Sequence, residues 1–185
     1  MKKNLYLDRV LWALLLLAGV FTMSACSDDD DDEPVNVEQS AVLGTWEMQQ
    51  ASLQMKVPGT AQKVTIDMRV VGGKTVPYLN GQRFDWDDMG IDPEDVEGLY
   101  ARISFEAGNK FTAYEYREGK WSAEDGGTYS LKNNVLTFEY EEEDDESWKV
   151  SRLTADAMEL EMTDFSDEEM AQVVEKATMT LRRMK

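Results

Sequence analysis

Histidine is absent from the 185 residues of the sequence, and cysteine occurs once, as Cys26. The absence of histidine removes the commonest general base, the commonest metal ligand and every histidine-dependent catalytic triad. Zinc chemistry also lacks its ligands, and a lone cysteine cannot form a disulfide within the chain. Carboxylates remain, but among 37 Asp and Glu residues some pair will lie at a catalytic separation by accident. We therefore expect no enzyme, no cofactor and no metal centre.

Basic residues are also scarce, since 19 Lys and Arg face 37 Asp and Glu, for a formal charge of −18 at pH 7. A phosphate backbone is bound chiefly through Lys and Arg, so this surface would repel it. The composition excludes nucleic acid as a partner.

Only one long apolar run is present, at the N-terminus. Lys2, Lys3 and Arg9 form a basic start to the chain, and Val10 to Ala25 is apolar but too short for an ordinary membrane span. Residues 1–25 are therefore predicted to be a signal peptide.

The residues around Cys26 predict a lipid anchor. The run Met23-Ser24-Ala25-Cys26 resembles the lipobox of bacterial lipoproteins, with methionine where leucine is usual. The resemblance implies that the Cys26 thiol receives diacylglycerol and becomes the new N-terminus, so that the membrane is a partner. Five aspartates at 28–32 resemble the signal that exports some lipoproteins to the outer face of the outer membrane. The alternative is a solvated spacer without a sorting role, since like charges repel and extend the chain.

The organisation that follows is a signal peptide over residues 1–25, an acidic flexible tether over 26–40 and one folded domain over 41–185. The tether has too few apolar residues to fold alone, whereas the remaining length is near the common domain size. The expected location is the outer membrane, with the lipid-anchored domain facing the cell exterior.

Apolar residues of the domain recur mostly at every second position, the period of half-buried antiparallel strands. Val64, Ile66, Met68 and Val70 are the clearest case, and turn signals separate the later runs. The pattern predicts an all-β, antiparallel meander, in which residues 72–100 look like an insertion. The first strand changes phase by one residue between Met48 and Ala51, which indicates a bulge or bend.

Two segments depart from the strand period. Asp92-Pro93 places an N-cap residue before a proline, which predicts a short helix around 93–100. Ser166 begins a capping box followed by apolar residues at helical spacing, which predicts a helix around 167–177 before a final strand from Thr178.

The strand order begins with Gly44-Thr45-Trp46, which resembles the Gly-x-Trp signature of lipocalins and of lipocalin-like domains in bacterial lipoproteins. The resemblance covers roughly residues 41–185 and implies a β-barrel of about eight strands. It also implies that Trp46 closes the barrel floor beneath an arginine of the last strand, either Arg182 or Arg183. A two-sheet sandwich is the alternative, since it shares the alternation and the turn spacing.

Aromatic residues are the remaining candidates for function. Tyr114 and Tyr116 share one strand face and carry polar tips, which suits a pocket mouth or a glycan platform. Trp86 and Trp148 are the other candidate ligand-binding residues, although a barrel wall packed by its own side chains would use aromatics too. The acidic loop 85–95 does not fit an EF-hand, which leaves an irregular calcium site against a solvated loop.

The function that these features predict is binding, without catalysis, of a small apolar or amphipathic ligand inside the barrel of a surface lipoprotein. An alternative is an accessory or interaction subunit with a filled barrel, docked onto an envelope protein partner. A small hydrolase is the third hypothesis.

Overall fold

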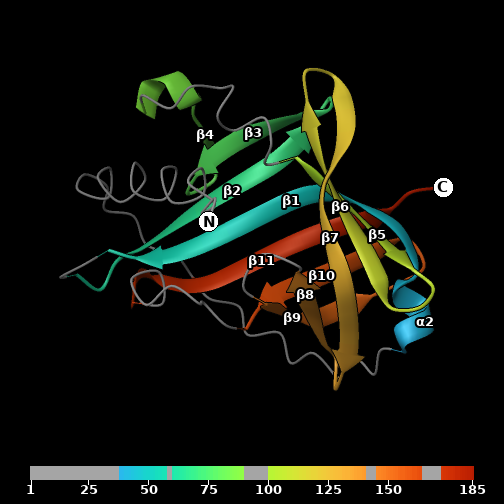
Figure 1. The fold of residues 1–185 in the computed structure, drawn as a ribbon. Coiled ribbons are helices and arrows are strands. Elements are labelled where there is room, and N and C mark those ends of the chain that lie inside the picture. Colours follow the sequence, from blue (N-terminus) through green and yellow to red (C-terminus); the bar gives the residue numbers. More distant parts are fainter. Residues whose placement is uncertain (1–37, 58–59, 90–99, 141–144, 164–171) are drawn as a thin grey trace.

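The computed structural model describes residues 38–57, 60–89, 100–140, 145–163 and 172–185 (Figure 1). Outside the described residues lie the signal peptide, the lipidation site Cys26, nearly all of the tether and the helix expected around 93–100, except its last residue, Tyr100, which forms a bend. Within the described part, no helix is both long enough and apolar enough to cross a membrane.

Strands make up almost all of the described chain, together with the short helix α2 (Gln39–Val42) and the 3₁₀ turn η1 (Trp86–Met89). The strands are β1 (Gly44–Lys56), β2 (Lys63–Val71), β3 (Lys74–Leu79), β4 (Gln82–Arg83), β5 (Ala101–Glu106), β6 (Lys110–Arg117), β7 (Lys120–Lys132), β8 (Val135–Tyr140), β9 (Glu146–Leu153), β10 (Ala157–Met162) and β11 (Val174–Arg183).

Eight of these strands form a closed antiparallel barrel, which confirms the predicted fold class. Strands β5 to β11 follow one another in sequence order, and β1 completes the ring because its first half pairs with β5 and its other edge with β11. Trp46 lies opposite Ile103 on one side and Arg183 on the other. A closed ring of this kind excludes the two-sheet sandwich.

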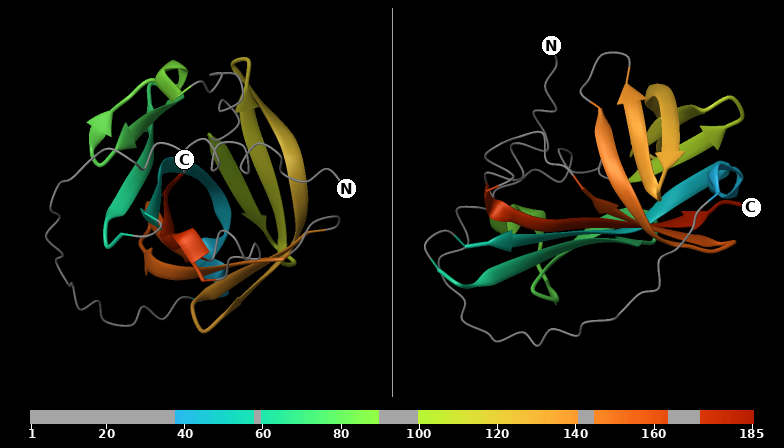
Figure 2. Two further views of the ribbon diagram at one scale, coloured as in Figure 1. Left: turned by 90° about the vertical axis from the view of Figure 1, so that its left-hand side faces the viewer. Right: turned by 90° about the horizontal axis from the view of Figure 1, so that it is seen from below.

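Strands β2 to β4 are an extension that leaves the ring. The second half of β1 pairs with β2, from Gln50 opposite Arg69 to Lys56 opposite Lys63, on the same edge where its first half pairs with β5. The register of β1 against β11 shifts between Met48 and Gln50, which confirms the predicted bulge. The bulge therefore marks the point where the sheet divides, and Figure 2 shows the β2–β3 hairpin standing apart from the β6–β7 hairpin.

The helix predicted around 167–177 is wrong at its C-terminal end. Residues 174–177 belong to β11, with Val174 opposite Met55 and Ala177 opposite Leu53. Only Gln172 and Val173 of the described residues there are helical. The ladder with β1 and the burial of Val174, a β-branched residue, outweigh the local helical spacing.

The barrel interior is packed with large apolar side chains. Its buried residues, all with little or no exposure, are Val42, Trp46, Met48, Phe105, Phe111, Tyr129, Leu136, Phe138, Trp148, Val150, Met158, Leu160 and Leu181. Strand β7 bends closely past β8, since a Cβ at Gly127 would lie 2.1 Å from the carbonyl oxygen of Glu139. Glycine is required there by the close approach of the two backbones.

Candidate functional site

The barrel floor is built from Gly44, Trp46, Arg183 and α2. Trp46 is fully buried, and the Arg183 guanidinium carbon lies 4.1 Å from the centre of its ring, a cation–π geometry. The indole N–H donates to the Val42 carbonyl at 2.7 Å, and Arg183 donates to the carbonyls of Leu43 and Ala41. Helix α2 is thereby fastened over this end of the barrel.

The geometry explains why Gly44, Thr45 and Trp46 suit their positions. Gly44 has φ +115°, and a Cβ there would lie 2.9 Å from Nη1 of Arg183. A side chain at this position would therefore be strained and would also obstruct the guanidinium. Thr45 faces Ser104 of β5, with their hydroxyls 3.2 Å apart. Of the two candidate arginines, Arg183 lies over the indole, and Arg182 does not.

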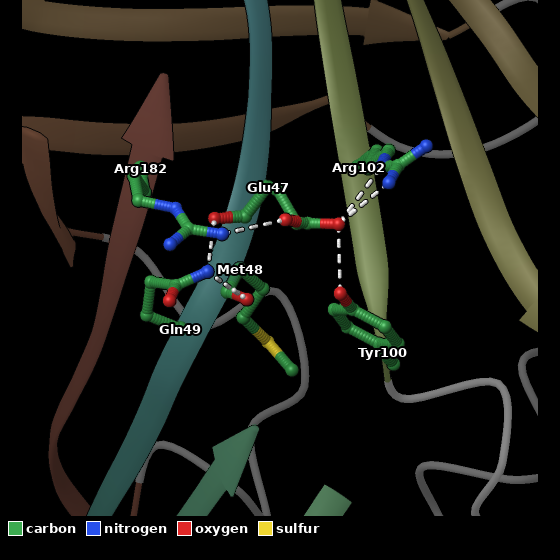
Figure 3. Close-up of polar contacts among 6 residues, drawn as sticks. All are labelled: Glu47, Met48, Gln49, Tyr100, Arg102 and Arg182. Atoms are coloured by element: carbon green, nitrogen blue, oxygen red, sulfur yellow. Dashed lines mark hydrogen bonds and ion pairs between the residues drawn. The ribbon is translucent and has the colours of Figure 1, made fainter. Parts of the chain in front are cut away.

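Arg182 instead belongs to a cluster on the outer face of the barrel, which we call the Glu47 network (Figure 3). Glu47 is 4% exposed although it points away from the interior. Its Oε1 accepts from Tyr100 Oη at 2.7 Å and from Arg102 Nη2 at 2.7 Å, and its Oε2 accepts from Arg182 Nη2 at 3.2 Å. One carboxylate thus joins β1, β5 and β11.

Within the Glu47 network, the surroundings favour the ionised form of Glu47 and the neutral form of Tyr100. Burial alone would raise the pKa of Glu47, but hydrogen bonds from Tyr100, Arg102 and Arg182 and the charge of Arg102 hold that pKa below its ordinary value. Burial, followed by the hydrogen bond to Glu47 and its charge, raises the pKa of Tyr100 to about 12. At neutral pH the cluster therefore holds an ionised carboxylate and a neutral phenol, an arrangement that suits a structural junction.

Next to this network lies an outer aromatic patch, formed by Tyr100, Tyr114, Tyr116 and Trp121. The Tyr100 ring lies edge-on to Trp121 with centroids 4.8 Å apart, and Tyr116 lies 5.1 Å from Trp121. Arg102 covers the Trp121 ring at 3.9 Å from its centre. Tyr114 is opposite Arg102 in the ladder, so it shares this face. The predicted pair Tyr114 and Tyr116 therefore lies on the outside of the barrel, away from its interior.

Trp148 lies inside the barrel, near the end away from α2, which we call the far end. It is 9% exposed, and its indole N–H donates to Glu146 at 3.3 Å. The Tyr140 hydroxyl donates to the same carboxylate at 3.4 Å. Tyr140 also contacts the Phe111 ring, with centroids 5.2 Å apart. The far end thus combines one exposed carboxylate with aromatic side chains.

Apolar side chains at the far end are only half buried. These inward-facing residues, which pack against the core but remain partly exposed, include Ala51, Ala113, Tyr140, Met162 and Met179. Trp46, Leu136 and Met158, by contrast, are fully buried towards the floor. The apolar interior is therefore partly open to solvent at the far end, and Ile103, Leu131 and Leu153 are also half buried nearer the floor.

Trp86 belongs to a different cluster, on the inner face of the extension. It is 6% exposed and packs with Met55, Ile66 and Val174. The Phe84 ring lies edge-on to it at 5.4 Å. The four predicted ligand-binding residues thus fall in three places: Tyr114 and Tyr116 outside, Trp148 at the far end and Trp86 on the extension.

Sequence reasoning missed the Glu47 network. The available signal was Glu47 itself, a charged residue between the inward-facing Trp46 and Met48, but its partners are 53, 55 and 135 residues away. Most of the loop 85–95 lies outside the described residues. Among the residues that the structure does describe, no group of three acidic or cysteine side chains is arranged to hold a metal ion.

Comparison with known proteins agrees with this geometry. The profile of a family described as a lipocalin-like domain matches residues 42–160, which is more than half of the chain. The match begins at the floor and ends in β10, so β11, which closes the ring, lies beyond it. A search of curated proteins finds no significant match. The chain belongs to the lipocalin-like domain family.

Proposed function

We propose that the protein is a lipid-anchored binding protein of the outer membrane, which holds a small apolar or amphipathic ligand at the far end of its barrel and catalyses no reaction. A lipocalin-like barrel is a fold suited to ligand binding. The observation that carries the proposal is the set of half-buried apolar side chains inside the closed ring at the far end, among them Met162 and Met179.

Methionine at these positions favours a binding role. Its unbranched, polarisable side chain adapts to ligands of different shape, which is why it is common at binding surfaces with broad specificity. Met162 lies opposite Trp148, and Met179 lies opposite both Ala51 and Leu160. An apolar ligand entering at the far end would contact flexible thioethers and aromatic rings.

The test compares two lysine substitutions on the same strand. Met162→Lys places a charge on the inner face, whereas Glu161→Lys places it on the neighbouring outward position, where Glu161 now pairs with Lys176 at 3.4 Å. Binding of an apolar fluorescent dye, and the lipid extracted with the protein from its host, should fall at least tenfold in the first variant and remain in the second. Equal binding by both variants would refute a site at the far end.

The anchor and the location rest on the sequence around Cys26 and the aspartates 28–32. Cys26→Ala should abolish incorporation of labelled fatty acid and leave an unprocessed or soluble product. Neutral residues in place of the five aspartates should reduce cleavage of the protein by protease added to whole cells. Unchanged cleavage would make this run a spacer.

A second candidate is an interaction subunit of an envelope assembly, favoured by the outer aromatic patch. Tyr114, Tyr116 and Trp121 are half buried on an outward face, where aromatic side chains commonly anchor protein partners. If Trp121→Ala removes an in-cell crosslink to an envelope protein while Met162→Lys has no effect on function, this candidate replaces the ligand-binding one.

A further inference from the structure

The inner face of the extension carries a hydrogen-bond donor that the fold itself does not use. Trp86 is 6% exposed, and its Nε1 is buried without a hydrogen-bond partner among the residues that the structure describes. Buried indole N–H groups nearly always have a partner, because water has been removed from them. An acceptor from outside the described chain would satisfy this one.

The direction of the donor is fixed by packing. The Trp86 ring is held between Phe84, at 5.4 Å between centroids, and the apolar cluster of Met55, Ile66 and Val174. The Thr75 hydroxyl on the same face also has no partner in the described part of the chain, but a hydroxyl rotates to suit its surroundings. On this face of the described residues, the indole is the donor that has a preset direction next to an apolar surface.

The apolar surface beside the donor is extensive and partly accessible. Side chains that pack against the buried cluster and remain half buried are Leu53, Val64, Met68, Leu79, Phe84 and Val173. Leu53, Val64 and Met68 lie on the face that β1 and β2 direct inward, since Leu53 is opposite Ile66 and Met55 is opposite Val64. A donor beside such a surface is the arrangement that recognises an amphiphile.

Charge around Trp86 decides which amphiphile fits. Asp85 and Asp87, its two neighbours in the chain, are exposed carboxylates. Arg83, the nearest cation along the chain, lies 3.7 Å from Asp85, so that carboxylate partly offsets its charge. The whole protein carries −18. A fatty-acid carboxylate would meet repulsion here, whereas an ester or amide carbonyl would accept the indole proton without a charge.

We propose that the inner face of the extension binds an uncharged long-chain ester or amide, whose carbonyl oxygen accepts the Trp86 N–H while its acyl chain lies along β1 and β2. The proposal rests on the ligand-binding function proposed above, but it places the ligand's polar group on the extension, outside the closed ring.

The experiment uses the full chain in lipid nanodiscs and three photoreactive probes with equal chain length and a mid-chain diazirine. The probes are a monoacylglycerol, the corresponding fatty acid and the corresponding alkane. Labelled peptides are identified by mass spectrometry for the unchanged protein, Trp86→Phe and Trp121→Phe. The last variant is the matched control, because Trp121 lies on the outer aromatic patch.

We expect the monoacylglycerol to label residues 60–79 at least tenfold more than the fatty acid at pH 7.5. In Trp86→Phe the ratio of monoacylglycerol to alkane labelling should fall about five- to tenfold, the effect of one neutral hydrogen bond, and in Trp121→Phe it should not change. This ratio is independent of how much of each variant is folded.

Three results would overturn the inference: equal ratios in Trp86→Phe and in the unchanged protein, equal labelling by fatty acid and monoacylglycerol, or labelling confined to peptides of β8 to β10. The third result would leave the far-end site intact. Labelling no stronger than in heat-denatured protein, with every probe, would refute both the inference and the proposed function.

Discussion

Replacing Glu47 with glutamine is expected to destabilise the protein by about 3 kcal/mol at pH 7. The substitution keeps the size of the side chain but removes the charge that Arg102 and Arg182 both contact. Removing one partner of a buried ion pair typically costs roughly 3 to 5 kcal/mol, because the remaining charge has no compensation. The lower end of this range applies, since the Arg182 side chain is 59% exposed and water can solvate it, whereas that of Arg102 is 25% exposed.

The dependence of the stability difference on pH is a second test of this prediction. The pKa of Glu47 is lower in the folded protein than in the unfolded chain, so its contribution to stability is present above the unfolded value, near 4.5. That contribution is lost as the pH falls through the lower, folded pKa. Protonated Glu47 resembles glutamine, so the stability gap between the two proteins should close in the same acidic range.

The assay is urea denaturation followed by tryptophan fluorescence at several pH values, with unchanged m-values as the check on two-state behaviour. Glu159→Gln is the matched control. It removes an ion pair with Arg152, whose side chain is 62% exposed, and should cost less than about 1 kcal/mol. A loss below about 1 kcal/mol for Glu47→Gln, or a gap that stays constant from pH 7 to pH 3, would refute the reasoning.

Four further substitutions test other parts of the fold. Trp46→Ala should cost about 3 to 5 kcal/mol in urea denaturation, as expected for a fully buried large aromatic. Arg183→Gln should cost about 2 kcal/mol, because it removes charged donors to backbone carbonyls. Tyr100→Phe should abolish the loss of stability between pH 10 and about 12, since the raised pKa of the phenol favours the folded state only until it ionises. Gly127→Ala should prevent folding, measured by circular dichroism, because its Cβ would lie 2.1 Å from the Glu139 carbonyl.

Local pattern predicted the strands well, because the period of two follows directly from burial on one side of a sheet. Val64 to Val70 lie in β2, and Leu136 to Tyr140 lie in β8. The bulge near Gln49 was also visible, as a change of phase between Met48 and Ala51. The local sequence pattern does not show which strands pair. The division of β1 between β5 and β2 is therefore seen in the structure alone.

The failure at Val174 has a different cause. Its spacing from Met170 and Ala177 suits a helix, but spacing describes only which residues share a face. The ladder between Met55 and Val174 is formed by a segment more than a hundred residues earlier. Similarly, the partners of Glu47 could not be chosen from 19 basic residues by sequence alone.

The pairing of β1 with β11 has a consequence for how the protein reaches its folded state. Trp46 and Arg183 come together only across nearly the whole length of the domain, so the ring cannot close until the last strand has been synthesised. Such contacts between distant segments raise the contact order and slow the folding of small domains. Until then, both edges of an open sheet would be available for pairing with other chains. Truncation just before β11 should therefore yield a chain that aggregates, and a chaperone that covers β1 during synthesis would increase the yield of the folded protein.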